Sequence, residues 1–389
     1  MSDSLGLYLH IPFCAHKCNY CDFLSSPMSY EARKRYVDAL CEELRYVAKS
    51  CKERRVDTIF FGGGTPSILS SEAILQIMTT IYRNFSVSKD AEISIEANPG
   101  AFARETCETW AYAGINRLSM GLQSACNEEL KLLGRIHSTE EFLESFLMAR
   151  EIGFSNINVD LMCALPHQTP EKFYGTLETV ASLSPEHLSV YNLIVEEGTL
   201  LAKWVEEGRD LGFPDEDTER QMYHETRRIL AKHGYERYEI SNYAKKGYEC
   251  KHNLRYWERK DYLGVGIGAA SLWEGKRFSN TVDFERYVSL LLEGESKDDF
   301  VLAKLRENEE VLTKEDCMAE FMFLGLRKIK GVSQEEFYKN FDIPMDSIYH
   351  DVIERHVKLS TLQIQGDALS LTEYGLDVSN SVMADFLFD

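Results

Sequence analysis

Short apolar runs alternate with longer amphipathic segments through the first half of the chain. The runs, rich in β-branched and aromatic residues, are Gly6–Ile11, Asp57–Phe61, Glu92–Glu96, Arg117–Met120, Asn156–Leu161 and Leu188–Leu193. Between them, apolar residues recur at helical spacing over Tyr30–Ser50, Ser71–Arg83, Arg104–Ala113, Thr139–Ile152 and Pro170–Leu183. This repetition predicts parallel strands joined by right-handed crossovers. Six such units favour an α/β fold with a partial barrel, whose site lies at the carboxyl ends of the strands.

From Pro214 onward the pattern changes. Asp217–His233 predicts one amphipathic helix, which an aromatic stretch, a loop around His252 and a glycine-rich run follow. The highly charged segment Asp298–Asn308 is typical of a linker or a solvated helix. The pattern of the last segment, Thr313–Asp389, predicts two or three helices and then a hairpin over Leu359–Leu371. Helices followed by a hairpin favour a winged-helix-like module. We therefore predict a partial barrel over 1–210, a completing or linking segment over 211–297 and a C-terminal module over 298–389.

Charge and cysteine usage narrow the class of protein. The chain has 389 residues, 44% of them hydrophobic, and a formal net charge of −20. Such acidity argues against a general nucleic-acid or anionic-membrane binder. Seven of the ten cysteines are scattered singly, which is not a disulfide framework and favours a reducing compartment. The first residues lack a secretory pattern, and no apolar run is long enough to span a membrane. We expect a cytoplasmic protein; peripheral membrane association and homodimerisation stay open.

Three cysteines lie on one short loop directly after the first predicted strand. Cys14, Cys18 and Cys21 have the spacing C-x3-C-x2-C. Thiolates are the ligands that iron–sulfur clusters prefer, and three of them leave the fourth iron of a cubane open to an outside ligand. One alternative is a zinc site completed by His10 or His16, although zinc usually takes four protein ligands in pairs. Another is three buried free cysteines.

Polar and glycine residues follow the later strands. Gly62–Ser67, with three consecutive glycines, comes after the second run, and such glycines let backbone amides approach a ligand. Glu96 ends the third run, Gln123 follows the fourth, and Arg135 comes twelve residues later. Asp160 lies inside an apolar run, where a carboxylate needs a partner or a ligand. Each could form a structural ion pair, but together they predict a polar lining at the strand ends.

These motifs together resemble the coproporphyrinogen III oxidase-like branch of the radical SAM superfamily. The resemblance covers most of the chain and implies a 4Fe–4S cluster on the three cysteines and bound S-adenosylmethionine. It implies that the cluster-bound S-adenosylmethionine contacts Tyr8, Gly63, Glu96 and a residue near Ala270. It further implies a second S-adenosylmethionine site, as in the oxidase, at Tyr20, Gly64, Thr65, Gln123, Arg135, Asp160 and Ile194. Ile194 departs from the small residue expected there.

Two features distinguish an oxidase from a heme carrier. The oxidase resembles C-x3-C-x2-C-x-C, whereas this chain has Phe23 at the fourth position and only thirteen residues before Cys14. The string His252-Asn253-Leu254-Arg255-Tyr256-Trp257 instead resembles the mark of the HemW-type heme chaperones. The resemblance implies that heme is bound and passed to an acceptor haemoprotein. A histidine can ligate heme iron and aromatic rings can stack on the macrocycle.

The heme residues predicted on this basis are His252, Tyr256 and Trp257. The structural alternative is a loop held by a hydrogen bond of His252, with the rings of Tyr256 and Trp257 in the core. Cys250 is a competing candidate for the heme ligand. The rival function is an oxygen-independent coproporphyrinogen III oxidase, so enzymatic activity stays open and no catalytic residue is assigned. A nucleic-acid role is not expected, because the C-terminal module lacks a basic recognition helix.

Overall fold

A curved sheet of twelve strands forms the body of the protein. The computed structural model describes residues 4–294 and 300–388. The strands lie in the order β12-β11-β10-β9-β1-β2-β3-β4-β5-β6-β8-β7, so the sheet does not close on itself. The six central strands are parallel and follow chain order: β1 (Ser4–Ile11), β2 (Arg55–Gly63), β3 (Ser86–Ala97), β4 (Arg117–Gln123), β5 (Ile157–Cys163) and β6 (His187–Asn192). The predicted partial barrel is confirmed.

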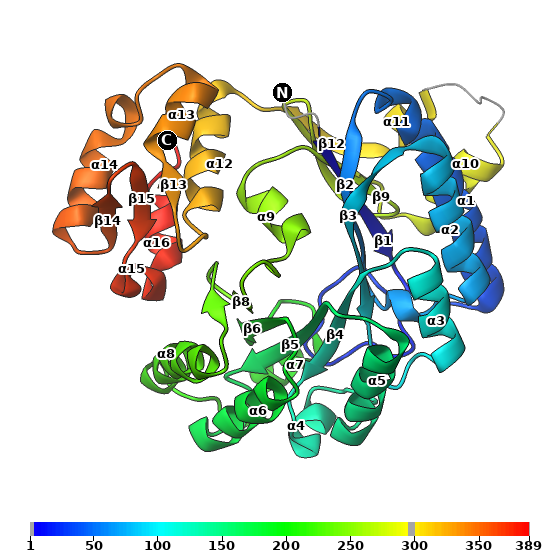
Figure 1. Cartoon of the computed structure of the whole chain (residues 1–389), viewed down its shortest axis with the longest axis horizontal. Coiled ribbons are helices and arrows are strands. Elements are labelled where there is room, and N and C mark those ends of the chain that lie inside the picture. Colours follow the sequence, from blue (N-terminus) through cyan, green and yellow to red (C-terminus); the bar gives the residue numbers. More distant parts are fainter. Residues whose placement is uncertain (1–3, 295–299, 389) are drawn as a thin grey trace.

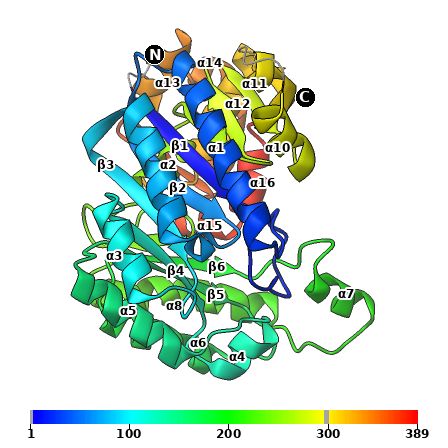
Figure 2. The ribbon, with the colours of Figure 1, turned by 90° about the vertical axis from the view of Figure 1, so that its right-hand side faces the viewer.

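Helices cover the convex face of this sheet (Figure 1). They are α1 (Tyr30–Ser50), α2 (Ser71–Asn84), α3 (Arg104–Tyr112), α4 (Asn127–Leu132), α5 (Thr139–Ile152), α6 (Pro170–Ser182) and α8 (Glu216–Lys232), with the short turn η1 (Pro66–Ile68) after β2. Side-chain N-caps start several of them; for example, Ser138 and Glu141 form a reciprocal capping box at α5. Helix α7 (Leu200–Glu206) projects from the body (Figure 2).

The second half of the chain extends both edges of the sheet. β9 (Tyr262–Val265) pairs in parallel with β1, and β10 (Ala270–Trp273), β11 (Lys276–Asn280) and β12 (Arg306–Val311) follow outward. At the other edge, β8 (Asn242–Ala244) pairs with β6 and β7 (Glu236–Arg237) with β8. Helix α10 (Phe284–Leu292) packs on α1. These edge strands are short, and no sequence pattern predicted them.

Two segments differ from the sequence-based expectation. The segment around His252, expected as a loop, is helix α9 (Lys251–Trp257), because Glu92 of β3 accepts hydrogen bonds from its first amides. Residues 298 and 299 of the expected linker lie outside the described residues. The remainder of that segment forms α11 (Phe300–Leu305), in which Val301, Leu302 and Leu305 are buried, and then the start of strand β12. This part is therefore not a linker: it is a helix with one buried and one exposed face, followed by an edge strand.

The C-terminal module has its own core and a three-stranded sheet. Its elements are α12 (Lys314–Gly325), β13 (Val332–Ser333), α13 (Gln334–Phe341), α14 (Asp346–Lys358), β14 (Leu362–Gln365), β15 (Ala368–Leu371), α15 (Glu373–Asp377) and α16 (Ser379–Ala384). β14 and β15 are the predicted hairpin. The module contacts the barrel through backbone hydrogen bonds, including one of 3.0 Å from Ile329 N to Tyr238 O, and through ion pairs of Glu320 with Arg259 and Arg277.

The predicted boundaries after residues 210 and 297 stay predictions. Among the residues that the structure describes, no helix combines the length and the apolarity needed to cross a bilayer.

Candidate functional site

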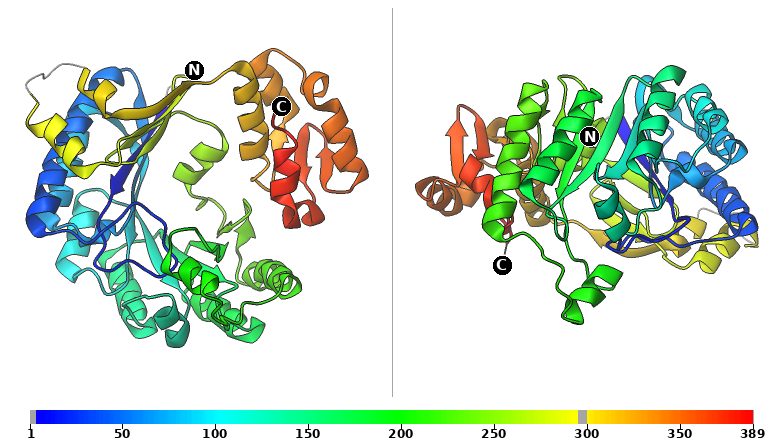
Figure 3. Two further views of the ribbon diagram at one scale, coloured as in Figure 1. Left: turned by 180° about the vertical axis from the view of Figure 1, so that it is seen from behind. Right: turned by 90° about the horizontal axis from the view of Figure 1, so that it is seen from below.

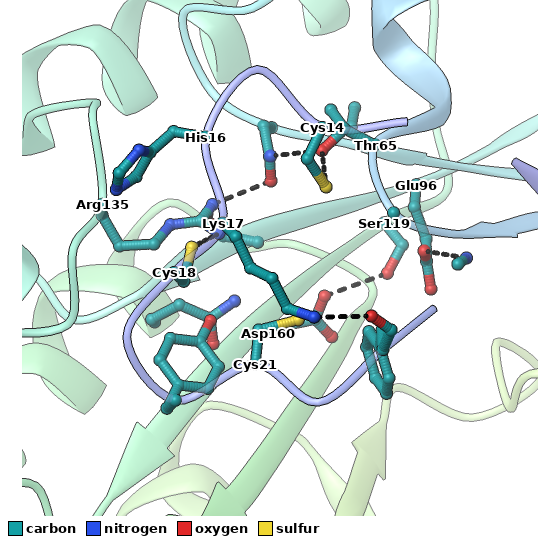
Figure 4. Close-up of a pocket in the computed structure, with 18 residues that line it drawn as sticks. Cys14, His16, Lys17, Cys18, Cys21, Thr65, Glu96, Ser119, Arg135 and Asp160 are labelled. Carbon is teal, nitrogen blue, oxygen red and sulfur yellow. Dashed lines mark hydrogen bonds between the residues drawn. The ribbon is translucent and has the colours of Figure 1, made fainter. Parts of the chain in front are cut away.

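The cysteine loop follows β1 and lies across the carboxyl ends of the central strands (Figure 3, left). It borders a cavity that polar side chains from β3, β4 and β5 also line (Figure 4). Eleven of the sequence-predicted site residues line this cavity: Cys14, Cys18, Tyr20, Cys21, Gly63, Gly64, Thr65, Glu96, Gln123, Arg135 and Asp160. Tyr8 lines an adjoining cavity that shares Glu96 and Asp160 with the first. The fold therefore brings together residues that are up to about 150 positions apart in the chain.

Backbone and amide hydrogen bonds hold the cysteine loop against neighbouring segments. The Asn19 side chain donates to Leu132 O at 2.8 Å, and its backbone N donates to Leu133 O at 2.9 Å. On the other side, Thr65 N donates to Phe13 O at 2.7 Å. The loop is thus fixed by the α4 end and by the glycine turn, which are far from it in sequence.

The three thiols point into the cavity from different positions. The Thr65 hydroxyl donates to Cys14 Sγ at 3.3 Å, and the Arg135 guanidinium lies 3.6 Å from Cys18 Sγ. Cys18 and Cys21 are partly exposed, and burial raises the pKa of the Cys21 thiol. Partial exposure at a cavity argues against three free cysteines packed in the core.

The geometry also disfavours a zinc site. In the described part of the chain, no three His, Cys, Asp or Glu side chains converge to hold one metal ion. A cubane takes one thiolate on each of three irons, so its ligands need not converge on a single point. Both ring nitrogens of His10 already have partners, the Tyr8 hydroxyl at 3.0 Å and Leu24 O at 2.9 Å.

The glycine turn fits closely beneath the cysteine loop. A β-carbon at Gly64 would lie 2.7 Å from Phe13 O and 2.9 Å from Ser25 Cβ. Gly63 has φ +110°, and a β-carbon there would meet the His10 ring. Its amide donates to Glu96 at 3.1 Å. The turn therefore needs glycine for contact with the loop, a requirement that sequence reasoning had ascribed to a ligand.

Two desolvated carboxylates, Glu96 and Asp160, give the cavity its electrostatic character. Burial, and next the nearby charge of Asp160, raise the pKa of Glu96 to about 8. Burial likewise raises the pKa of Asp160, although Asn158 donates to it at 2.7 Å. Desolvated carboxylates of this kind favour a cationic ligand, because a positive charge would stabilise their ionised form.

An arginine gives the opposite charge on the other side of the cavity. Arg135 donates to Asn98 Oδ1 at 2.8 Å and to Gly121 O at 2.6 Å, while its buried Nε has no partner among the described residues. Asn98 also donates to Thr65 at 3.0 Å. Sequence reasoning missed Asn98 and Ser119 as lining residues, although Asn98 stands two positions after Glu96 and could have been found there.

Other predicted residues lie elsewhere. Ile194 is 64% exposed and lines neither of these two cavities, which leaves a second S-adenosylmethionine site without support from this residue. Ala270 lines a third cavity together with Tyr8 and Tyr256.

Helix α9 places His252 on the wall of the adjoining cavity, whose volume is about 410 Å³. The side chain is 1% exposed, with Nδ1 2.9 Å from the Thr58 hydroxyl and Nε2 2.8 Å from the Tyr256 hydroxyl. Burial, with the nearby arginines, lowers the pKa of His252 to about 3. Trp257 lies outside this cavity, under the Arg327 guanidinium. Ligation of heme iron by His252 stays a prediction, and it requires the ring to give up one of these partners.

Comparison with known proteins defines the class. A family model described as "Radical SAM superfamily" matches residues 8–180, and one described as "HemN C-terminal domain" matches residues 312–378. In a solved structure, coproporphyrinogen III oxidase (HemN) from Escherichia coli, a radical SAM enzyme, superposes with a TM-score of 0.84 at 27% identity, covering 98% of this chain and 90% of the other. Fold and site thus define a radical SAM protein.

Full-length relatives narrow the class further. The heme chaperone HemW of Bacillus subtilis is 37% identical, and that of Lactococcus lactis 35%; the alignments cover 98% of this chain in both cases and 98% and 97% of the relatives. The chain belongs to the heme chaperone HemW family. A radical SAM domain implies a 4Fe–4S cluster and S-adenosylmethionine.

Proposed function

We propose that the chain is a heme chaperone, which binds heme and passes it to an acceptor haemoprotein, and that it carries a 4Fe–4S cluster beside an S-adenosylmethionine site. The observation that supports this most is a single cavity lined by three thiols, two desolvated carboxylates and an arginine, in a member of the HemW family. The relatives' names describe heme chaperones.

The residues of the cavity suit the two groups. Cys14, Cys18 and Cys21 would hold the cluster, which when bound supplies one-electron chemistry and an iron open to an outside ligand. Glu96 and Asp160, desolvated at the cavity wall, would face the positive charges of S-adenosylmethionine. The remaining residues assigned to this site are Tyr8, Tyr20, Gly63, Gly64, Thr65, Gln123 and Arg135.

For heme, the aromatic wall around α9 is the proposed site. Phe60 stacks on His252 with ring centroids 5.3 Å apart, and the Tyr256 ring packs edge-on against Tyr262. A flat macrocycle is held by such aromatic surfaces. His252, Tyr256 and Trp257 are the proposed heme residues, with Cys250 as the competing ligand to iron.

The cluster would act as a trigger for heme delivery rather than as a source of catalytic radicals, because Phe23 stands where the oxidase pattern has a fourth cysteine. The test is a heme titration by absorbance, with and without reconstituted cluster, followed by transfer to an apo-haemoprotein. Binding of one heme per chain and cluster-dependent transfer support the proposal; absence of heme binding rejects it. Transfer that is unchanged after the cluster is removed rejects the trigger alone. Heme binding unaffected in His252→Ala rejects only that ligand.

The second function, an oxygen-independent coproporphyrinogen III oxidase, rests on the superposition with HemN. Formation of vinyl groups from the propionates of coproporphyrinogen III, with reductant and S-adenosylmethionine, distinguishes it from a carrier. Homodimerisation, cytoplasmic location and peripheral membrane contact stay predictions.

A further inference from the structure

A separate cavity lies where the C-terminal module meets the barrel. Its volume is about 870 Å³, which is in the range of cavities that bind organic ligands. The end of α9, the turn between β10 and β11, α12 and α13 surround it. Figure 1 shows α9 between the curved sheet and α12. Neither the cysteines nor His252 line this cavity.

Two polar groups of its wall, Lys328 and the indole N–H of Trp257, lack a close partner. Lys328 is 7% exposed; Glu258 and Glu336 attract its charge, but in the parts of the chain that the structure describes no carboxylate lies close enough to form an ion pair with it. The buried indole N–H of Trp257 likewise has no acceptor there. A largely buried ammonium without a close ion-pair partner is costly, and burial lowers the pKa of Lys328, although the charge of Glu258 opposes this shift. The Lys328 ammonium could donate to an anion in the cavity.

Most other charges around the cavity are paired. The pairs are Arg259–Glu320, Lys260–Glu258, Lys339–Glu335 and Arg54 with Asp261 and Glu274. Lys330 lies 3.9 Å from Glu258, whose closer partner is Lys260. Glu336, on the wall, is exposed. Lys328 and Lys330 thus add positive charge that the wall does not fully offset, in a chain whose net charge is −20.

We infer that this cavity binds a flat aromatic ligand that carries carboxylates, with Lys328 donating to a carboxylate and Lys330 adding positive charge beside it. The partly buried ring of Phe321 provides an apolar surface for the ligand body. The inference rests on the proposed function, since the propionates and macrocycle of a porphyrin have this chemistry. It places the propionates at the interface of barrel and module, next to the residue that ends α9.

The test measures the affinity of the full-length protein for two compounds. One is protoporphyrin IX, which lacks iron, and the other is its dimethyl ester, which lacks the free carboxylates. One charge-assisted hydrogen bond of about 1.5–3 kcal/mol corresponds to roughly a tenfold or greater preference for the free acid. Lys328→Met removes the charge at similar length and should abolish the preference. Lys328→Arg should keep it, and so should the control Lys358→Met, at an exposed lysine paired with Glu354 on α14.

The outcomes separate this inference from the proposed function. A folded Lys328→Met protein that keeps the preference overturns the site, while heme binding by the wild type leaves the chaperone intact. Displacement of protoporphyrin by inorganic pyrophosphate but not by excess acetate overturns the ligand class in favour of a phosphate ligand. Wild-type protein that binds neither heme nor protoporphyrin overturns the proposed function itself.

Discussion

Replacing Gly64 by alanine should weaken cluster binding without touching a thiol. The new methyl group would lie 2.7 Å from Phe13 O and 3.0 Å from Ile11 O, and these carbonyls accept from Thr65 N and Gly64 N at 2.7 and 2.8 Å. The cysteine loop must therefore move away from the turn that holds it. Phe13 directly precedes the first cysteine, so the displacement reaches the proposed ligands.

The cost follows from two local terms. Overpacking of a close contact costs about 1–3 kcal/mol, and each weakened backbone hydrogen bond costs about 0.5–1.5 kcal/mol. A net cost of about 2 kcal/mol corresponds to roughly a thirtyfold shift toward an open loop. The strand and its helices are unaffected, so the protein should stay folded.

The assay is iron and sulfide per chain after anaerobic reconstitution, with the rate of cluster loss to a chelator. We expect Gly64→Ala to lose its cluster at least tenfold faster than wild type. The control is Gly175→Ala in α6, where a β-carbon meets open space, and where alanine should add up to about 1 kcal/mol of helix stability. If Gly64→Ala and wild type retain iron equally, the turn does not support the cluster loop.

Three further predictions concern single side chains. Because the pKa of Glu96 is near 8, a cationic ligand must displace a proton from it below that pH. The affinity of the reconstituted protein for S-adenosylmethionine, measured by calorimetry, should therefore rise up to about pH 8 and then level off. Glu96→Gln should bind weakly with no such rise, and a variant with the wild-type pH profile would contradict the assignment. Burial raises the pKa of Glu43 to about 7, so the folded state holds the proton more tightly than the unfolded state. The free energy of unfolding should therefore fall by about 3 kcal/mol as pH rises from about 4.5 to 7. In Glu43→Gln, the urea midpoint of unfolding should lack this part of its dependence on pH. Tyr256→Phe removes the hydroxyl bound to His252 Nε2, so heme affinity should rise severalfold if that nitrogen ligates iron; a fall in affinity would argue against it.

The sequence predicted the six parallel strands and the residues at their ends because both leave a local pattern. Each strand is a short apolar run between amphipathic helices, and its polar residue stands at or near the carboxyl end. Glu96 and Gln123 could be placed in one cavity on this basis alone, because parallel strands bring their carboxyl ends to the same edge. Asp160 was marked by its position inside an apolar run.

Features that depend on distant contacts could not be predicted in this way. α9 is a helix because Glu92, about 160 positions earlier, accepts from its first amides. β9 joins the barrel by pairing with β1, about 250 positions earlier in the chain, and its four residues are too few for a clear alternation. The glycines were ascribed to a ligand, since only the fold reveals that Phe13 occupies the space of a side chain at Gly64.

The most direct measurement is an anaerobic incubation of reconstituted protein with dithionite, S-adenosylmethionine and coproporphyrinogen III, beside a heme titration of the same preparation. A heme chaperone should bind one heme per chain and form no decarboxylated porphyrinogen, while the E. coli oxidase as control forms it. Vinyl product from this chain would make it an oxidase and reduce α9 to a structural element. Absence of both product and heme binding would contradict the proposed function altogether.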